Sequence, residues 1–142
     1  MPPSLIENLQ SDFELLDDWE ERYRYVIELG RSLAPFEEKW RNATYKVRGC
    51  ASQVWIHPRL EVKNGQEIMH FEGDSDALIV KGLIAVAFMI FSGQTPQHIL
   101  AQDAAAIFAK LGLKDHLTPQ RSNGLASMVE RIKSDARFVL QA

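Results

Sequence analysis

Cys50 is the side chain best suited to chemistry in this sequence, and it is the one cysteine among 142 residues. Lys46 and Arg48 precede it, and Gly49 stands directly before it. Nearby positive charge favours the thiolate, which is the nucleophilic form of a thiol. A glycine allows a tight or positive-φ backbone and leaves room for another molecule to approach the sulfur. The segment therefore predicts a reactive thiol in a loop between two strands.

The same cysteine also has a structural interpretation, because a free cysteine is commonly a small buried hydrophobic residue. Against this, a loop between strands is a frequent place for functional residues. A third hypothesis is a cysteine hydrolase or transferase in which Cys50 is the nucleophile and His57 or His70 is the general base. The predicted hairpin gives no reason for either imidazole to reach the sulfur, and we expect both histidines to be exposed on the sheet. A regulatory binding module with an incidental cysteine is a further alternative.

The composition excludes several classes of protein. One cysteine forms no internal disulfide, and it builds neither a cysteine-rich zinc site nor an iron–sulfur site, which needs about four protein ligands. With 16 Lys plus Arg against 19 Asp plus Glu, the net charge is −3. A pI of about 5.8 gives no basic surface for nucleic acid. The length of 142 residues predicts one domain, residues 1–142, with a core of its own.

Two further patterns concern the location of the protein. The segment Met1 to Asp12 lacks a charged region followed by an apolar stretch, so it does not predict a secretory leader. The longest apolar run, Leu83 to Phe91, is far shorter than the roughly 20 residues that cross a bilayer. We therefore expect a cytoplasmic protein with no membrane partner, and we interpret the apolar run as a buried helix.

The elements around Cys50 are predicted to form a small antiparallel sheet. From Gln53 to Val62 polar and apolar residues alternate, as in a strand with one buried face. Asn64-Gly65 is typical of a two-residue type I′ turn, which fixes the register of a hairpin. The predicted pairs are Val62 with Glu67, Leu60 with Met69 and Pro58 with Phe71. Thr44 to Arg48 is a weaker candidate for a third strand, which would return against Val54 and Ile56.

Helices are predicted before and after this sheet. Their expected starts are Ser4 with Glu7, Asp17 or Asp18, Thr95-Pro96, Asp103 and Thr118-Pro119. Gly30 is expected to end a helix in the left-handed conformation. Ala77 to Phe91 is predicted to be a mostly buried helix, and the triplet Asp74-Ser75-Asp76 supplies its N-cap. This order predicts an α+β fold in which N- and C-terminal helices flank a three-stranded antiparallel sheet.

Four separated motifs resemble one known family. The peptide Val47-Arg48-Gly49-Cys50-Ala51-Ser52-Gln53-Val54-Trp55 is similar to the cysteine loop of the SufE family. Three further stretches agree in order and spacing: Trp19 to Gly30, Gly73 to Leu83 and Leu117 to Leu125. Together they cover nearly the whole chain. Ala51 departs from the polar residue that relatives often have, and the hairpin over residues 57–70 differs in length and sequence.

The resemblance implies a SufE/IscU-like fold and a sulfur acceptor and activator for a cysteine desulfurase. Cys50 would take the outer sulfur of a persulfide on a SufS-type desulfurase and relay it to a SufBCD-type scaffold for iron–sulfur cluster assembly. A CsdA-type desulfurase is the alternative partner. No cofactor is expected on this chain, since pyridoxal phosphate belongs to the desulfurase. No independent turnover is expected either, and the expected assembly is a monomer or homodimer.

The predicted site consists of Cys50 together with candidates for loop or partner contact, which are Arg48, Gly49, Ser52, Gln53, Asp74, Asp76 and Arg121. By family analogy, Asp74, Asp76 and Arg121 lie near the cysteine loop and either orient it or meet the desulfurase. The alternative is that the two carboxylates cap the following helix and that Arg121 binds helix-terminal carbonyls or a carboxylate. We also expect the free protein to shelter Cys50 against apolar groups, because an exposed persulfide would be lost to reductants.

Overall fold

The computed structural model describes residues 5–141, apart from the side chain of Lys114. Its helices are α1 (Leu5–Glu14), α2 (Trp19–Arg31), α3 (Leu78–Phe91), α4 (Pro96–Ala101), α5 (Ala104–Lys110), α6 (Leu113–His116) and α7 (Pro119–Gln141). A 3-10 turn, η1 (Glu38–Trp40), precedes the strands β1 (Val54–Lys63) and β2 (Gln66–Ser75). The predicted α+β class is confirmed. The helix start predicted at Ser4 lies outside the described residues.

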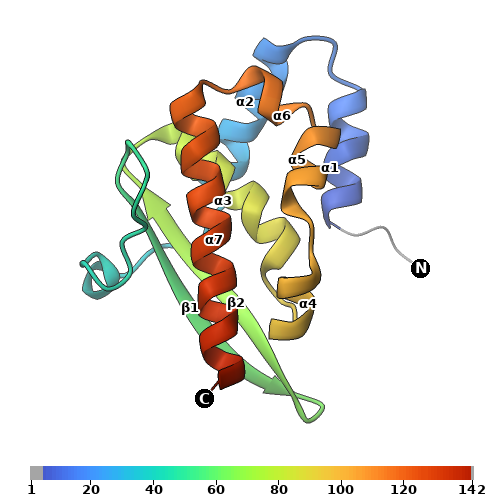
Figure 1. Ribbon diagram of the computed structural model, residues 1–142. Coiled ribbons are helices and arrows are strands. Elements are labelled where there is room, and N and C mark those ends of the chain that lie inside the picture. Colours follow the sequence, from blue (N-terminus) through green and yellow to red (C-terminus); the bar gives the residue numbers. More distant parts are fainter. Residues whose placement is uncertain (1–4, 142) are drawn as a thin grey trace.

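The hairpin has the predicted register. Pro58 pairs with Phe71, Leu60 with Met69 and Val62 with Glu67. Asn64 and Gly65 have φ angles of 54° and 78°, as a type I′ turn requires. In Figure 1 the hairpin tip extends beyond the helices, so the apolar side chains of Leu60 and Val62 are exposed although they belong to the face that is buried further along the strands.

The prediction of a third strand is wrong, because the sheet within residues 5–141 has two strands. The segment before Cys50 does return against β1, but it forms a single bridge between Lys46 and Trp55. Two backbone hydrogen bonds hold it, from Val47 N to Val54 O at 2.8 Å and from Ile56 N to Tyr45 O at 2.9 Å. The next donor on that edge of β1 would be residue 58, and a proline has no N–H to give. The ladder therefore stops there.

Helix α3 forms the centre of the core. Nearly all of its residues are buried, and Figure 1 shows it between the hairpin and α7 on one side and α1 and α5 on the other. Where α2 crosses α3, Gly30 and Gly82 lie in contact. A Cβ on Gly30 would stand 2.5 Å from the backbone nitrogen of Gly82, and a Cβ on Gly82 would stand 2.2 Å from the carbonyl oxygen of Val26. The two glycines thus allow the close packing of these helices.

Gly30 does not end α2, so that expectation is wrong. The helix continues to Arg31, and its C-cap is Ser32 in a right-handed conformation. The physical reason for the glycine is the approach of α3, which a local capping pattern does not reveal.

The helix starts that depend on local hydrogen bonds are confirmed. Four side chains accept from a backbone N–H three residues ahead, at 2.9 to 3.2 Å: Asp18, Thr95, Asp103 and Thr118. The N-cap predicted at the triplet before α3 is wrong, because α3 begins after Ala77, which makes no side-chain cap bond. Ser75 accepts instead from the N–H of Ala77 at 3.2 Å, and the two aspartates bind elsewhere.

Among the described residues, no helix combines the length and apolarity that crossing a membrane requires.

Candidate functional site

Cys50 lies in a short exposed loop between two buried anchor points. Val47 and Val54 are buried and are joined by the backbone bond that closes the loop. Gly49 has a φ of +89°, which a residue with a side chain rarely adopts. The predicted positive-φ glycine before the cysteine is therefore confirmed, and the loop turns sharply at the residue before the thiol.

The thiol itself points inward. Cys50 Sγ donates to the carbonyl oxygen of Gly124 on α7 at 3.5 Å, and it lies in a pocket of about 240 Å³. Buried side chains of Val80, Leu83 and Met128 form the inner wall of this pocket. A group of the size of a water molecule takes roughly 30 Å³. The pocket therefore has room for a further sulfur atom, and Cys50 lies half-buried between its apolar inner wall and the polar residues of its rim.

Burial raises the pKa of the Cys50 thiol above its ordinary value. The expectation that Lys46 and Arg48 favour the thiolate is thus wrong for this conformation. Both basic side chains are exposed and border a separate groove on the far flank of the loop, together with Ser127 of α7. In the inward position the cysteine is a protonated, weakly reactive thiol at neutral pH.

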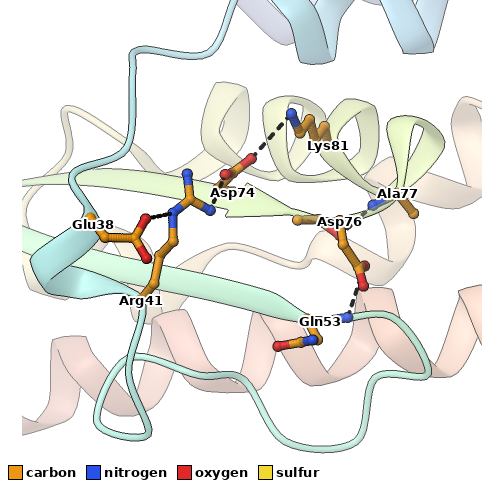
Figure 2. Close-up of polar contacts among 8 residues, drawn as sticks. Glu38, Arg41, Gln53, Asp74, Asp76, Ala77 and Lys81 are labelled. Carbon is orange, nitrogen blue, oxygen red and sulfur yellow. Dashed lines mark hydrogen bonds and ion pairs between the residues drawn. The ribbon is translucent and has the colours of Figure 1, made fainter.

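Asp76 and Gln53 join the end of the loop to the start of α3. The N–H of Gln53 donates to Asp76 Oδ1 at 3.1 Å, and the N–H of Asp76 donates to the carbonyl oxygen of Gln53 at 3.3 Å. Figure 2 shows the carboxylate of Asp76 directed toward Gln53. Asp76 thus lies beside the cysteine loop, and its bond to Gln53 fixes the chain three residues after the thiol.

Asp74 points in another direction, toward the turn that contains η1. Its carboxylate forms ion pairs with Arg41 and, at 3.4 Å, with Lys81, while Arg41 also pairs with Glu38 at 2.9 Å (Figure 2). Burial by itself would raise the pKa of Asp74. The bonds from Arg41 and the Ser75 backbone and the nearby cationic charges outweigh burial, so the pKa lies below its ordinary value. Asp74 therefore holds the η1 segment, not the thiol.

The sequence patterns did not predict a role for Arg41. Its guanidinium carbon lies 5.4 Å from the ring centre of Phe36 and 5.5 Å from that of Trp55. The strand residue Asp74 and the preceding turn are thus joined through one arginine. No short-range pattern could have paired these residues.

Arg121 and Ser52 complete the surroundings of the thiol. Both line the Cys50 pocket, and the exposed residues Ala51 and Thr118 line it as well. The guanidinium carbon of Arg121 lies 5.9 Å from the ring centre of Tyr23, which orients the cation beside the pocket. Arg121 therefore lies beside the cysteine loop, on the pocket that holds the thiol.

The two candidate general bases lie elsewhere. The ring of His57 stacks on Trp40 with centroids 3.8 Å apart, and its side chain is 15% exposed, so its expected exposure is wrong. His70 lies 3.0 Å from the carboxylate of Glu61 on the hairpin. Among the residues described, neither histidine lines the Cys50 pocket. The arrangement therefore does not support a cysteine–histidine hydrolase. Within residues 5–141, no group of three or more His, Cys, Asp or Glu side chains is placed to hold a metal ion.

Comparison with known proteins decides the family. The model of the SufE family, described as the Fe-S metabolism associated domain, matches residues 7–136. This chain belongs to the SufE family. Its membership associates it with iron–sulfur metabolism, and it confirms the resemblance drawn from the cysteine loop and the three other motifs.

Curated SufE-like relatives match over most of their length. An uncharacterised SufE-like protein of Rhizobium etli is 50% identical over 132 residues, which is 93% of this chain and 89% of the relative. One of Rhizobium meliloti is 48% identical over 137 residues, which is 96% of this chain and 98% of the relative. The solution structure of a hypothetical protein from Thermus thermophilus has a TM-score of 0.76, covers 100% of both chains and is 20% identical. That likeness supports the fold alone.

Proposed function

We propose that this SufE-family chain accepts a sulfur atom from a cysteine desulfurase on Cys50 and passes it on for iron–sulfur cluster assembly. The observation that carries the proposal is the position of the chain's one cysteine. It stands on a loop that turns sharply at Gly49, with its sulfur turned into a pocket that has room for a second sulfur atom. Membership of a family associated with iron–sulfur metabolism supplies the context for the sulfur.

The proposed step is thiol exchange at sulfur. The Cys50 thiolate attacks the outer sulfur of a persulfide on the desulfurase cysteine, so a new sulfur–sulfur bond forms on Cys50. The bond between the two donor sulfurs breaks, and the desulfurase cysteine leaves as a thiolate. One sulfur has moved with its formal oxidation state unchanged, and no external oxidant or reductant takes part. The persulfide on Cys50 is the product that the chain carries.

The inward and outward positions of the loop have different chemical roles in this proposal. Inside the pocket, burial keeps Cys50 protonated, and the walls shield a bound persulfide from small reductants. For transfer, the loop swings about Gly49 so that Sγ meets the partner's sulfur in water-accessible surroundings, where the thiolate forms more readily. Arg121 beside the pocket supplies positive charge on the path of the emerging sulfur.

The partner expected for this step is a SufS-type desulfurase, and a SufBCD-type scaffold is the expected recipient. Pyridoxal phosphate on the desulfurase generates the persulfide, so this chain needs no cofactor for the exchange. A free, single thiol is maintained best in a reducing compartment, and we place the relay in the cytoplasm. The absence of a second cysteine in the chain suits a carrier, because an internal thiol would convert the persulfide to a disulfide and release the sulfur.

The test is the intact mass of the chain after incubation with a desulfurase and free cysteine. Wild type is expected to gain one sulfur atom, which a strong reductant removes, whereas Cys50→Ser gains none. SufS-type and CsdA-type desulfurases are compared in parallel reactions, and faster loading by the CsdA-type enzyme would reassign the partner. No gain of sulfur with either desulfurase would overturn the proposed function.

A further inference from the structure

The chain that leads into the cysteine loop lies along one face of α7. Arg131 contacts the backbone at Thr44 and Lys46, while Ser127 meets Gly49. Gly124 accepts the hydrogen bond from Cys50. The three α7 positions, 124, 127 and 131, are three and four residues apart, so they share one helix face. As the loop advances from residue 44 to residue 50, its contacts move back along α7, from residue 131 to 124.

Arg131 makes the strongest of these contacts. Its two terminal nitrogens donate to the carbonyl oxygen of Thr44 at 2.6 Å and to that of Lys46 at 3.2 Å. Its Nε donates to Asp135 Oδ1 at 3.2 Å, and the two side chains are 24% and 17% exposed. A planar guanidinium with several fixed donors can make all these bonds at once, which a lysine cannot. Asp135 thus orients the cation that binds the stem of the loop, which consists of residues 44–47.

The small residues of this face let the loop come close. A Cβ on Gly49 would stand 2.6 Å from Ser127 Oγ, so the loop backbone is already in contact with this serine. A Cβ on Gly124 would stand 3.6 Å from Cys50 Sγ, in the space beside the sulfur. A larger side chain at position 127 would press on the loop, and a larger one at position 124 would take the room of a second sulfur atom.

The stem is also held from its other side. The ring of Tyr45 lies 4.9 Å from that of His57, edge to face, and His57 stacks on Trp40. The backbone of Tyr45 accepts from Ile56 at 2.9 Å. Residues 44–47 are therefore fixed between β1 and α7, whereas residues 48–53 depend on Gly49, on the bond from Cys50 and on the Asp76 pair.

We propose that the face of α7 formed by Gly124, Ser127 and Arg131 is the seat of the cysteine loop, and that Arg131 is the positioning residue that fixes its stem. The seat sets the depth of Sγ in the pocket and confines the swing of the loop to the segment after Val47. The meaning of the seat for sulfur transfer rests on the proposed function of Cys50. Its existence can be tested without any sulfur donor.

The test is the alkylation rate of Cys50 with iodoacetamide in the free, full-length chain. Arg131→Lys keeps the charge beside Asp135 but loses the paired carbonyl bonds, and it is expected to raise the rate about tenfold. Ser127→Leu displaces Gly49 and is expected to raise the rate several-fold. Two controls on α7 are expected to leave the rate unchanged. Arg137→Lys alters an exposed pair with Glu130, and Ala126→Leu places the same bulk at an exposed position outside the Cys50 pocket.

Amide hydrogen exchange separates positioning from general destabilisation. The two seat variants should lose protection in residues 44–53 while α3 keeps it. A rise in alkylation that is matched by lost protection in α3 would mean global unfolding and would count against the seat. Rates of Arg131→Lys and Ser127→Leu within twofold of wild type would overturn it. If Arg131→Lys does not fold, Ser127→Leu decides alone.

The outcomes for the seat and for the proposed function are distinguishable. If the seat variants alkylate faster but wild type accepts no sulfur, the seat stands and the sulfur-acceptor role fails. If wild type accepts sulfur but the seat variants alkylate like wild type, the acceptor role stands and the seat fails.

Discussion

Removing the carboxylate of Asp76 should release the cysteine loop. The perturbation is Asp76→Ala, which deletes the acceptor of the Gln53 N–H bond of 3.1 Å. A hydrogen bond to a charged group contributes about 1.5 to 3 kcal/mol, and a typical exposed one is nearer 1 kcal/mol. Both residues are exposed, and the reverse bond from Asp76 N to Gln53 O involves only backbone atoms and survives the change. We therefore use about 1 kcal/mol, which corresponds to about a fivefold increase in the open population.

The assay is the rate of iodoacetamide reaction at Cys50 at neutral pH, under conditions in which the loop opens and closes many times before it reacts. The measured rate is then proportional to the open population, so about fivefold faster reaction is expected. Asp103→Ala is the matched control. It deletes the same kind of bond, from the N–H of Ala106 to a carboxylate at 3.1 Å, at the start of α5.

A rate for Asp76→Ala within twofold of wild type would mean that the Gln53 bond does not hold the loop. An equal acceleration in Asp103→Ala would also count against this bond. In that case the effect would come from general destabilisation and not from the loop.

Two other predictions follow from the described contacts. Because burial raises the pKa of the Cys50 thiol, the alkylation rate of wild type should rise with pH around a midpoint above that of an unstructured peptide thiol. This midpoint should fall in Asp76→Ala, in which the loop is open more often. Identical midpoints in both proteins would contradict the assigned burial. Gly82→Ala should lower the free energy of unfolding, measured by urea, by about 1 to 3 kcal/mol, since its Cβ would stand 2.2 Å from Val26 O. Gly124→Ala, whose Cβ meets Cys50 at ordinary contact distances of 3.6 Å and more, should leave stability unchanged or increased, and an equal loss in both variants would refute the packing argument.

Most parts of the fold that depend on short-range bonds could be predicted from the sequence, with the cap expected at the triplet before α3 as the exception. The hairpin register follows from a two-residue turn and an alternating pattern, and the caps at Asp18, Thr95, Asp103 and Thr118 need a partner only three residues away. Three expectations failed because the residues concerned depend on contacts with another segment of the chain. Gly30 serves a contact with α3, the third strand stops where Pro58 lacks a donor, and His57 is covered by a turn that precedes the strand.

The candidate site also contains residues that could be predicted from the sequence and residues that could not. The resemblance brought Cys50, Gln53, Asp76 and Arg121 together, and the structure places these four around one loop. Asp74 belongs to the same motif as Asp76, but its side chain binds Arg41 next to the η1 turn. The arginine of the proposed seat could not be predicted, because Arg131 binds carbonyls that are 85 and 87 residues away in the sequence. Backbone carbonyls carry no sequence signal, so such a contact becomes visible only in the folded chain.

The most direct test of the sulfur-carrier role is a single-turnover transfer. A desulfurase loaded with persulfide is mixed with an equal amount of this chain, the reaction is stopped by alkylation, and both proteins are weighed and mapped by peptide mass. If Cys50 carries the sulfur, each sulfur lost from the desulfurase is found on Cys50, and Cys50→Ser leaves the desulfurase loaded. Sulfur lost from the desulfurase without appearing on Cys50, or sulfur found on the Cys50→Ser chain, would contradict the sulfur-carrier role.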